Sequence, residues 1–210
     1  MALACAWLSP LSAQQLLDRV IARVNGSPIT LTDLAIATAL GVVGDPAAPD
    51  AAASPDQQLI DRAIMMAEVA RFPPPEPPPA EIDKQVATYR AHVGGRLADL
   101  MRSTGLDDER LRQIARDTVR LQAYLGQRFG TSAIVPEDDV RQYYESHAPE
   151  FTRNGRLLPF EDVEPEARAA AAAARRRVTV AQWLRDLQAR GDIAVVPPPP
   201  QTPPPAPVQK

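Results

Sequence analysis

The stretch "VIARVNGSPITLTDL", residues 20–34, predicts a short β-hairpin that runs directly into a helix. Its first half is rich in β-branched side chains, which suit a pleated and half-buried surface. Asn25-Gly26 tolerates the positive φ angles of a two-residue hairpin turn. The return strand, residues 27–30, contains Pro28, which cannot donate to a ladder and therefore belongs at a sheet edge. Two strands alone are marginal in water, so we expect a third strand from elsewhere in the chain.

Most of the chain after the hairpin has helical patterns. Thr30 is expected to cap the first helix, with Asp33 completing a capping box. Ser54 is expected to cap the second helix, with Pro55 at its first turn and Gln57 as its capping-box residue. These two helices are expected at about residues 31–43 and 56–70, and others at about 80–93, 96–104, 108–129 and 137–146, with a long one at about 161–190.

Two interruptions separate these helices. "RFPPPEPPPAE", residues 71–81, forces an extended polyproline segment. It could be a ligand for a proline-reading domain, but a stiff connector is the simpler interpretation. "APEFTRNGRLLPFEDV", residues 148–163, reads as a polar link with a glycine turn.

Arg112, Arg116 and Arg120 repeat at four-residue spacing along the helix expected at residues 108–129. They could bind an acidic partner, but a solvated helix face is the simpler interpretation.

The missing third strand is predicted near the other end of the chain. "DIAVV", residues 192–196, follows the glycine that ends the long helix and has strand composition. The two ends of the chain should then meet in one sheet with all the helices between them. The predicted fold is therefore mainly α, with a small β-sheet that joins an N-terminal hairpin to a C-terminal strand.

Composition excludes several classes of protein. The 210-residue chain carries a net charge of −3, which argues against nucleic-acid binding. One cysteine excludes an intrachain disulfide and a cysteine metal cluster. Neither histidine has a metal-ligand spacing, and no glycine-rich loop that could cradle phosphate is present, so no cofactor or metal is expected. No apolar stretch reaches 18 residues, so no transmembrane helix is expected.

The two ends of the chain differ in composition from its middle. Residues 1–13 are apolar and end in Leu-Ser-Ala, like the end of a secretory signal peptide, so export is expected. Residues 14–196 form the expected folded domain, in which the helix and strand of residues 158–196 return to the hairpin. Residues 197–210 are proline-rich and are expected to be disordered.

Three segments together resemble a known family. "VNGSPITLTDL", "LIDRAIMMAEVARF" and "VPEDDVRQYYESHAPEF" are similar to the N-terminal module of SurA-type periplasmic chaperones, related to the peptide-binding part of trigger factor. The resemblance spans about residues 18–196 and implies a periplasmic location in a Gram-negative-type bacterium. In that family, parvulin prolyl isomerase domains are inserted before the returning helix. Here only "PEFTRNGRLLPF" occupies that interval, so the sequence predicts that the isomerase domain is lacking.

The resulting functional hypothesis is a non-catalytic, ATP-independent chaperone that holds unfolded or extended polypeptides, including outer-membrane protein precursors. Flexible methionines with tyrosines suit such a groove. The candidate peptide-binding residues are Met65, Met66, Tyr89, Met101, Tyr124 and Tyr144, each of which could equally belong to the core. Two alternatives stay open: an assembly subunit that docks on one dedicated envelope partner, and a peptidyl-prolyl isomerase. Since no nucleophile lies near a base, the sequence predicts that the protein is not an enzyme.

Overall fold

The computed structural model describes residues 18–44, 53–130 and 134–197 of the chain. The predicted signal segment, residues 1–13, and all but the first residue of the predicted disordered tail lie outside the described residues. The described chain is mainly helical with a small antiparallel sheet, which confirms the predicted fold class. None of its helices is long and apolar enough to cross a membrane.

The predicted sheet is present. Strand β1 (Val20–Val24) pairs on one side with β2 (Ser27–Thr30) and on the other with β5 (Ile193–Val195), both antiparallel. The hairpin turn has positive φ at Asn25 (48°) and Gly26 (81°), the conformation that this residue pair favours. The turn also contacts the segment just before β5, because Asn25 N donates to Asp192 O at 2.8 Å. The two chain ends therefore meet in one sheet, as predicted.

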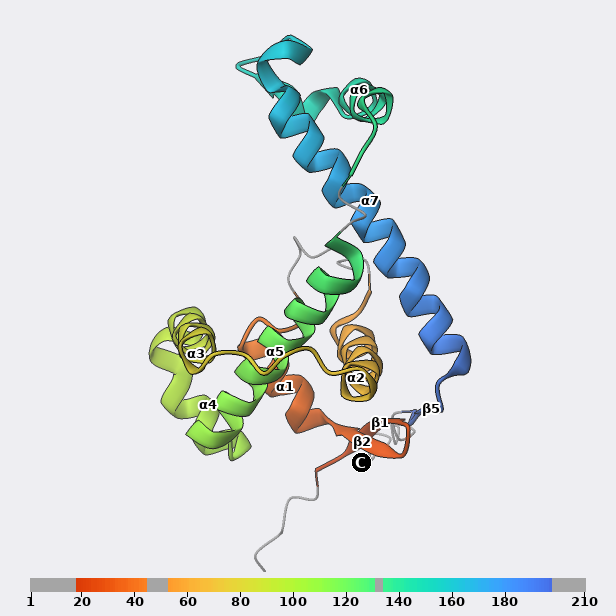
Figure 1. The fold of residues 1–210 in the computed structure, drawn as a ribbon. Coiled ribbons are helices and arrows are strands. Elements are labelled where there is room, and N and C mark those ends of the chain that lie inside the picture. Colours follow the sequence, from red (N-terminus) through yellow and green to blue (C-terminus); the bar gives the residue numbers. More distant parts are fainter. Residues whose placement is uncertain (1–17, 45–52, 131–133, 198–210) are drawn as a thin grey trace, which may run out of the picture.

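The helices between the strands form the rest of a unit that we call the body. They are α1 (Leu31–Ala39), α2 (Pro55–Arg71), α3 (Pro79–Val93), the short 3-10 helix η1 (Gly94–Arg96), α4 (Leu97–Thr104) and α5 (Asp108–Phe129). In Figure 1 the connector between α2 and α3 runs across α5. One cluster of buried residues lies between the sheet, α2, α5 and α7; a second joins α1, α3 and α5.

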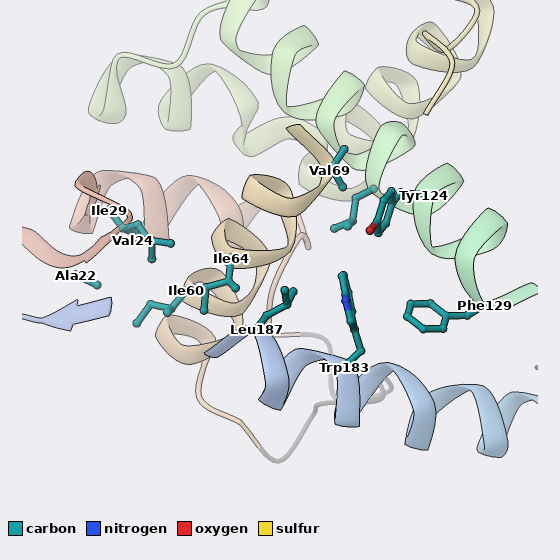
Figure 2. Close-up of a cluster of buried hydrophobic side chains, with 11 residues drawn as sticks. Ala22, Val24, Ile29, Ile60, Ile64, Val69, Tyr124, Phe129, Trp183 and Leu187 are labelled. Carbon is teal, nitrogen blue, oxygen red and sulfur yellow. The ribbon is translucent and has the colours of Figure 1, made fainter. Parts of the chain in front are cut away.

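The remaining elements form a second unit, which we call the arm. It comprises α6 (Glu137–Ser146), the 3-10 helix η3 (Ala148–Phe151), the two-residue strands β3 (Thr152–Arg153) and β4 (Arg156–Leu157), and the N-terminal half of α7. Helix α7 (Phe160–Arg190) is continuous and links arm to body (Figure 1). Figure 2 shows where its C-terminal part joins the body: Trp183 points toward Tyr124 and Phe129 of α5.

The predicted N-terminal caps of α1 and α2 differ in outcome. Thr30 and Asp33 form the full capping box of α1, with Thr30 N donating to Asp33 Oδ2 at 3.0 Å. Ser54 is the N-cap residue of α2 and Pro55 begins the helix, as predicted. The predicted capping box is wrong, because the Ser54 side chain makes no capping hydrogen bond and Gln57 instead donates to Asp61 Oδ1 at 2.8 Å. Pro55 at the first position already removes one unsatisfied amide, which lessens the need for a cap.

For residues 148–163, the predicted glycine turn is confirmed, but the interpretation as a polar link was wrong. Phe151 is fully buried at the centre of the arm. Asn154 (φ 53°) and Gly155 (φ 74°) form a second tight turn between β3 and β4, which pair antiparallel. The same Asn-Gly signal that revealed the first hairpin was present here, and its flanking strands were too short to recognise by alternation.

Candidate peptide-binding site

A hollow of about 220 Å³ lies where β2, α1, α2 and α5 meet; we call it the α1–α2 hollow. Its walls are mostly aliphatic: Ile29, Ile36, Leu59, Met66 and Ile114. Asp33, Arg62, Arg110 and Asp117 contribute polar groups to the same lining. An apolar hollow with a few converging polar groups is the usual form of a ligand site.

The polar groups of this hollow are held by its walls. Arg62 Nη2 donates to Thr118 Oγ1 at 2.7 Å, and the Tyr89 hydroxyl lies 2.6 Å from the same oxygen. Burial lowers the pKa of the Arg62 guanidinium, although arginine remains protonated in proteins. Arg110 lies 3.5 Å from Asp33 Oδ1. Two arginines and two aspartates leave the lining without net charge, so it suits an uncharged apolar side chain flanked by backbone amides.

The six predicted peptide-binding residues do not lie in one groove. Met66 lines the α1–α2 hollow, and Tyr124 lines a second hollow at the end of α2. Tyr89 and Tyr124 are buried, Met65 packs on the cluster beneath the sheet, Met101 packs on the cluster of α1, α3 and α5, and Tyr144 packs in the arm. Helical spacing shows which side chains share a face but not which faces meet, so their grouping was not visible in the sequence.

The second hollow, of about 520 Å³, is lined by Arg71, Phe72 and Pro73 from the end of α2 and by Tyr124, Gln127 and Arg128 from α5. We call it the Phe72 hollow. The Phe72 side chain is 58% exposed, and the Arg71 guanidinium lies 5.6 Å from its ring centre. Sequence reasoning missed Phe72, because it had been assigned only to the start of the connector.

The arginine stripe on α5 is not a free binding surface. Arg112 pairs with Asp83 of α3, and Arg116 Nε lies 3.2 Å from Glu76 Oε1 in the connector. Both arginine side chains are partly exposed, in keeping with the predicted solvated face, and their acidic partners come from neighbouring segments of the chain.

An aromatic cluster marks the end of α6; it contains Tyr143, Tyr144, His147 and Phe151. The Tyr143 and His147 rings stack with centroids 3.9 Å apart and planes 8° apart. The Tyr143 hydroxyl donates to Glu150 Oε2 at 3.1 Å, and His147 Nδ1 lies 3.0 Å from the Tyr143 carbonyl oxygen. Burial, and then the hydrogen bond and charge of Glu150, raise the pKa of Tyr143 above its ordinary value.

Among the described residues, no group of three or more histidine, cysteine, aspartate or glutamate side chains could hold a metal ion. The aromatic cluster of the arm therefore offers three kinds of group: the protonated hydroxyl of Tyr143, the ring of His147 and the carboxylate of Glu150. Such groups can bind a ring-bearing side chain and donate hydrogen bonds to a peptide.

Comparison with protein families gives one match. Residues 135–210 match the PPIC-type PPIASE domain (Rotamase_2). PPIC-type domains bind peptide substrates, so the predicted class of partner, a polypeptide, is supported. The matched segment includes α6, the aromatic cluster, α7 and β5. A comparison with curated proteins found no match to the chain.

This match overturns several predictions. The chain was expected to be a SurA-type N-terminal module without a prolyl isomerase domain, to be non-catalytic, and not to be an enzyme; a PPIC-type domain over residues 135–210 contradicts all three. The error came from where the domain was sought. Only the interval between residues 149 and 160 was considered, whereas the match runs through the two flanking helices and on to the end of the chain.

Proposed function

We propose that the protein is a peptidyl-prolyl isomerase of the PPIC type, which binds extended proline-containing polypeptides and speeds rotation about their Xaa-Pro bonds. The family match over residues 135–210 carries this proposal. Uncatalysed rotation takes tens to hundreds of seconds, slow enough to limit folding, so a protein that binds unfolded chains gains from speeding it.

The chemistry requires no nucleophile or metal. Amide resonance makes the barrier about 18–20 kcal/mol, and the twisted transition state loses that resonance. The planar amide is the more polar form, so a surface that excludes water favours the twisted form. A hydrogen-bond donor near the prolyl nitrogen also stabilises it, because the nitrogen lone pair is no longer delocalised.

The aromatic cluster of α6 provides suitable groups within the matched segment. The stacked Tyr143 and His147 rings offer an apolar surface for a proline ring. The Tyr143 hydroxyl donates to Glu150 Oε2 at 3.1 Å, so it would turn from this carboxylate to the prolyl nitrogen when a substrate binds. The α1–α2 hollow, which includes Met66, would hold an apolar side chain elsewhere along the same extended substrate.

The direct test measures the cis-to-trans rate of an Ala-Pro tetrapeptide with the purified full chain, by a protease-coupled assay or by NMR exchange. We expect a concentration-dependent rate, and a loss of about 10-fold in kcat/KM for Tyr143→Phe or His147→Gln, which corresponds to about 1.4 kcal/mol of transition-state stabilisation.

The chain supplies a matched control. His92, the other histidine, is exposed on α3 beside Gly41, outside the matched segment. His92→Gln should keep the full rate. A full chain that is folded but gives no rate above the uncatalysed one would exclude the proposed activity, and equal losses in the His92 and His147 variants would exclude the aromatic cluster as its site.

We further propose a periplasmic location, with unfolded outer-membrane protein precursors among the substrates. The signal-like residues 1–13 and the apolar lining of the α1–α2 hollow support this. Fractionation of the bacterial envelope tests the location. Dilution of a denatured outer-membrane barrel protein with and without the full chain, followed by light scattering, tests the substrate: reduced aggregation without ATP would support it, and unchanged aggregation would exclude it.

A further inference from the structure

The Phe72 hollow has no part in the proposed isomerase site, yet its lining is chemically distinctive. An aromatic side chain that is 58% exposed lies beside Pro73 and the buried ring of Tyr124. The polar groups around it are mainly donors: the guanidinium groups of Arg71 and Arg128, and the amide of Gln127. Arg128 Nη1 is 3.4 Å from the Tyr124 hydroxyl, which holds the arginine over this side of α5.

A surface of this kind matches one class of ligand. Proline has no backbone N–H, so a polyproline segment presents carbonyl acceptors and ring faces but almost no donors. Aromatic-lined grooves with nearby donors are the recurring way in which proteins bind polyproline II helices. The polyproline II helix is already extended before binding, so little conformational entropy is lost.

The body already holds one proline-rich segment against α5. In the connector after α2, Pro74 and Pro77 are buried, whereas Pro73, Pro75 and Pro78 are exposed. Burial at every third residue is the period of a polyproline II helix. The ion pair between Glu76 and Arg116 of α5 fixes this segment at its centre. The Phe72 hollow begins at the N-terminal end of the connector, so a second proline-rich segment could lie beside the first.

We propose that the Phe72 hollow is a binding site for a polyproline II segment and that its occupant is the C-terminal tail of the chain itself, residues 198–210. Seven of these thirteen residues are proline, and none is acidic or aromatic. The tail therefore brings acceptors and ring faces to a site that offers donors and an aromatic ring. Its one charged side chain is Lys210.

The length of the tail is sufficient. The chain leaves the sheet where Val196 N donates to Ile21 O at 2.8 Å, beside the cluster that contains Ile60 of α2. Phe72 lies twelve residues farther along α2, about 18 Å at 1.5 Å per residue. Thirteen residues in polyproline II form span about 40 Å at 3.1 Å per residue. The tail can thus reach the hollow with several residues to spare.

The test places a nitroxide at the end of the tail in the full chain. Lys210→Cys is labelled in a Cys5→Ser background, and backbone NMR signals are compared with those of the reduced, diamagnetic label. We expect strong broadening at Phe72 and Gln127 and none at η1, which follows the C-terminal end of α3. Phe72→Ala in the same labelled chain should abolish the broadening; this substitution is tolerated because most of the Phe72 side chain is exposed.

Two results would overturn the proposal. Absence of broadening at Phe72 in the labelled chain would exclude the tail as occupant, and broadening that persists in the Phe72→Ala variant would exclude the hollow as its site. A synthetic peptide of residues 197–210 is the competitor: in excess it should relieve the broadening. If it shifts the signals of the hollow in a chain whose own tail causes no broadening, the occupant is a proline-rich segment from another molecule. None of these readings depends on isomerase activity.

Discussion

The buried clusters of the body and of the arm draw on different lengths of chain, although helix α7 belongs to both units. The buried cluster beneath the sheet combines residues from β1, β2, α2, α5 and the end of α7, so its members range from Ala22 to Leu187. The buried cluster of the arm uses only residues between Val135 and Ala171. The body therefore needs the two chain ends to meet, whereas the arm closes within one short stretch of chain.

This difference has a physical consequence. Bringing distant segments together costs loop-closure entropy before any contact is made, so the body is expected to form late and cooperatively. The arm has a small core and packs on one face of α7, so its stability should depend on few side chains. The proposed isomerase site lies in the arm, and both hollows lie in the body.

The largest expected loss of stability comes from removing one buried aromatic side chain in the arm or in the body. Phe151 is fully buried in the arm, and Phe151→Ala should cost about 3–5 kcal/mol by leaving a cavity there. Trp183→Ala should cost a similar amount in the body. Hydrogen exchange read residue by residue should show fast exchange confined to α6 in the first variant, with α2 and α5 still protected. If Phe151→Ala deprotects α2 as well, arm and body unfold as one unit and the comparison fails.

A second prediction sharpens the role of Trp183. Its indole Nε1 is buried with no hydrogen-bond partner in the described part of the chain, and such a donor costs about 1–3 kcal/mol. Trp183→Phe keeps most of the aromatic contact with Phe129 and removes this donor. The loss of unfolding free energy in urea should therefore be much smaller for Trp183→Phe than for Trp183→Ala. Equal losses would show that the full indole is required for packing.

The next effect concerns the helix that both units share. Val178 lies in the middle of α7 and is 69% exposed, so its side chain contributes little. Val178→Pro should cost about 3 kcal/mol or more by breaking the helix, and should change the orientation of the arm, measured by small-angle X-ray scattering. Val178→Ala is the control and should leave both stability and scattering nearly unchanged. An unaltered scattering curve for the proline variant would mean that contacts other than α7 hold the arm.

A smaller effect compares two helix starts within the body. Thr30→Ala removes the side chain that accepts from Asp33 N at 3.1 Å, and should cost about 1 kcal/mol. Ser54→Ala should change the unfolding free energy by no more than a few tenths, because Ser54 makes no side-chain capping bond. Urea unfolding of both variants measures this difference, and a cost for Ser54→Ala equal to that for Thr30→Ala would contradict it.

The smallest effect is a pH dependence in the arm. The pKa of Tyr143 is raised from its ordinary value of 10.0, first by burial and then by Glu150, so the folded arm favours the protonated phenol. That contribution to stability is present below the unfolded pKa near 10 and is lost as the pH rises through the higher folded value. The difference absorbance titration of wild type against Tyr143→Phe should show one phenol that ionises above pH 10. A phenol that ionises at its ordinary pKa would contradict the arrangement with Glu150.

Much of the architecture could be predicted from the sequence, because its signals are local. The Asn25-Gly26 turn, the Thr30–Asp33 capping box and the glycine that ends α7 each act within a few residues. The need for a third strand then left residues 192–196 as its source, and β5 is there. By contrast, the short hairpin after Phe151 was missed, since two-residue strands show no alternation.

The candidate site was predicted less well. Met66 and Tyr124 were proposed from residue type and do line hollows, yet they line different ones. Phe72 was not proposed as a site residue, and the stacking of Tyr143 on His147 was not foreseen, because both features depend on neighbours brought close by the fold. The isomerase domain was excluded by counting residues in one interval, and the family match shows that this interval was the wrong place to count.

The sequence by itself determined the hairpin, the helices and the closure of the sheet, since periodicity, turn residues and caps act over short distances of chain. Tertiary structure decided which helix faces meet, where the two hollows open, and that α7 carries one unit at each end. The physical reason is that packing depends on side chains from segments as far apart as Ala22 and Leu187, and their relative positions are fixed only when the whole core has closed.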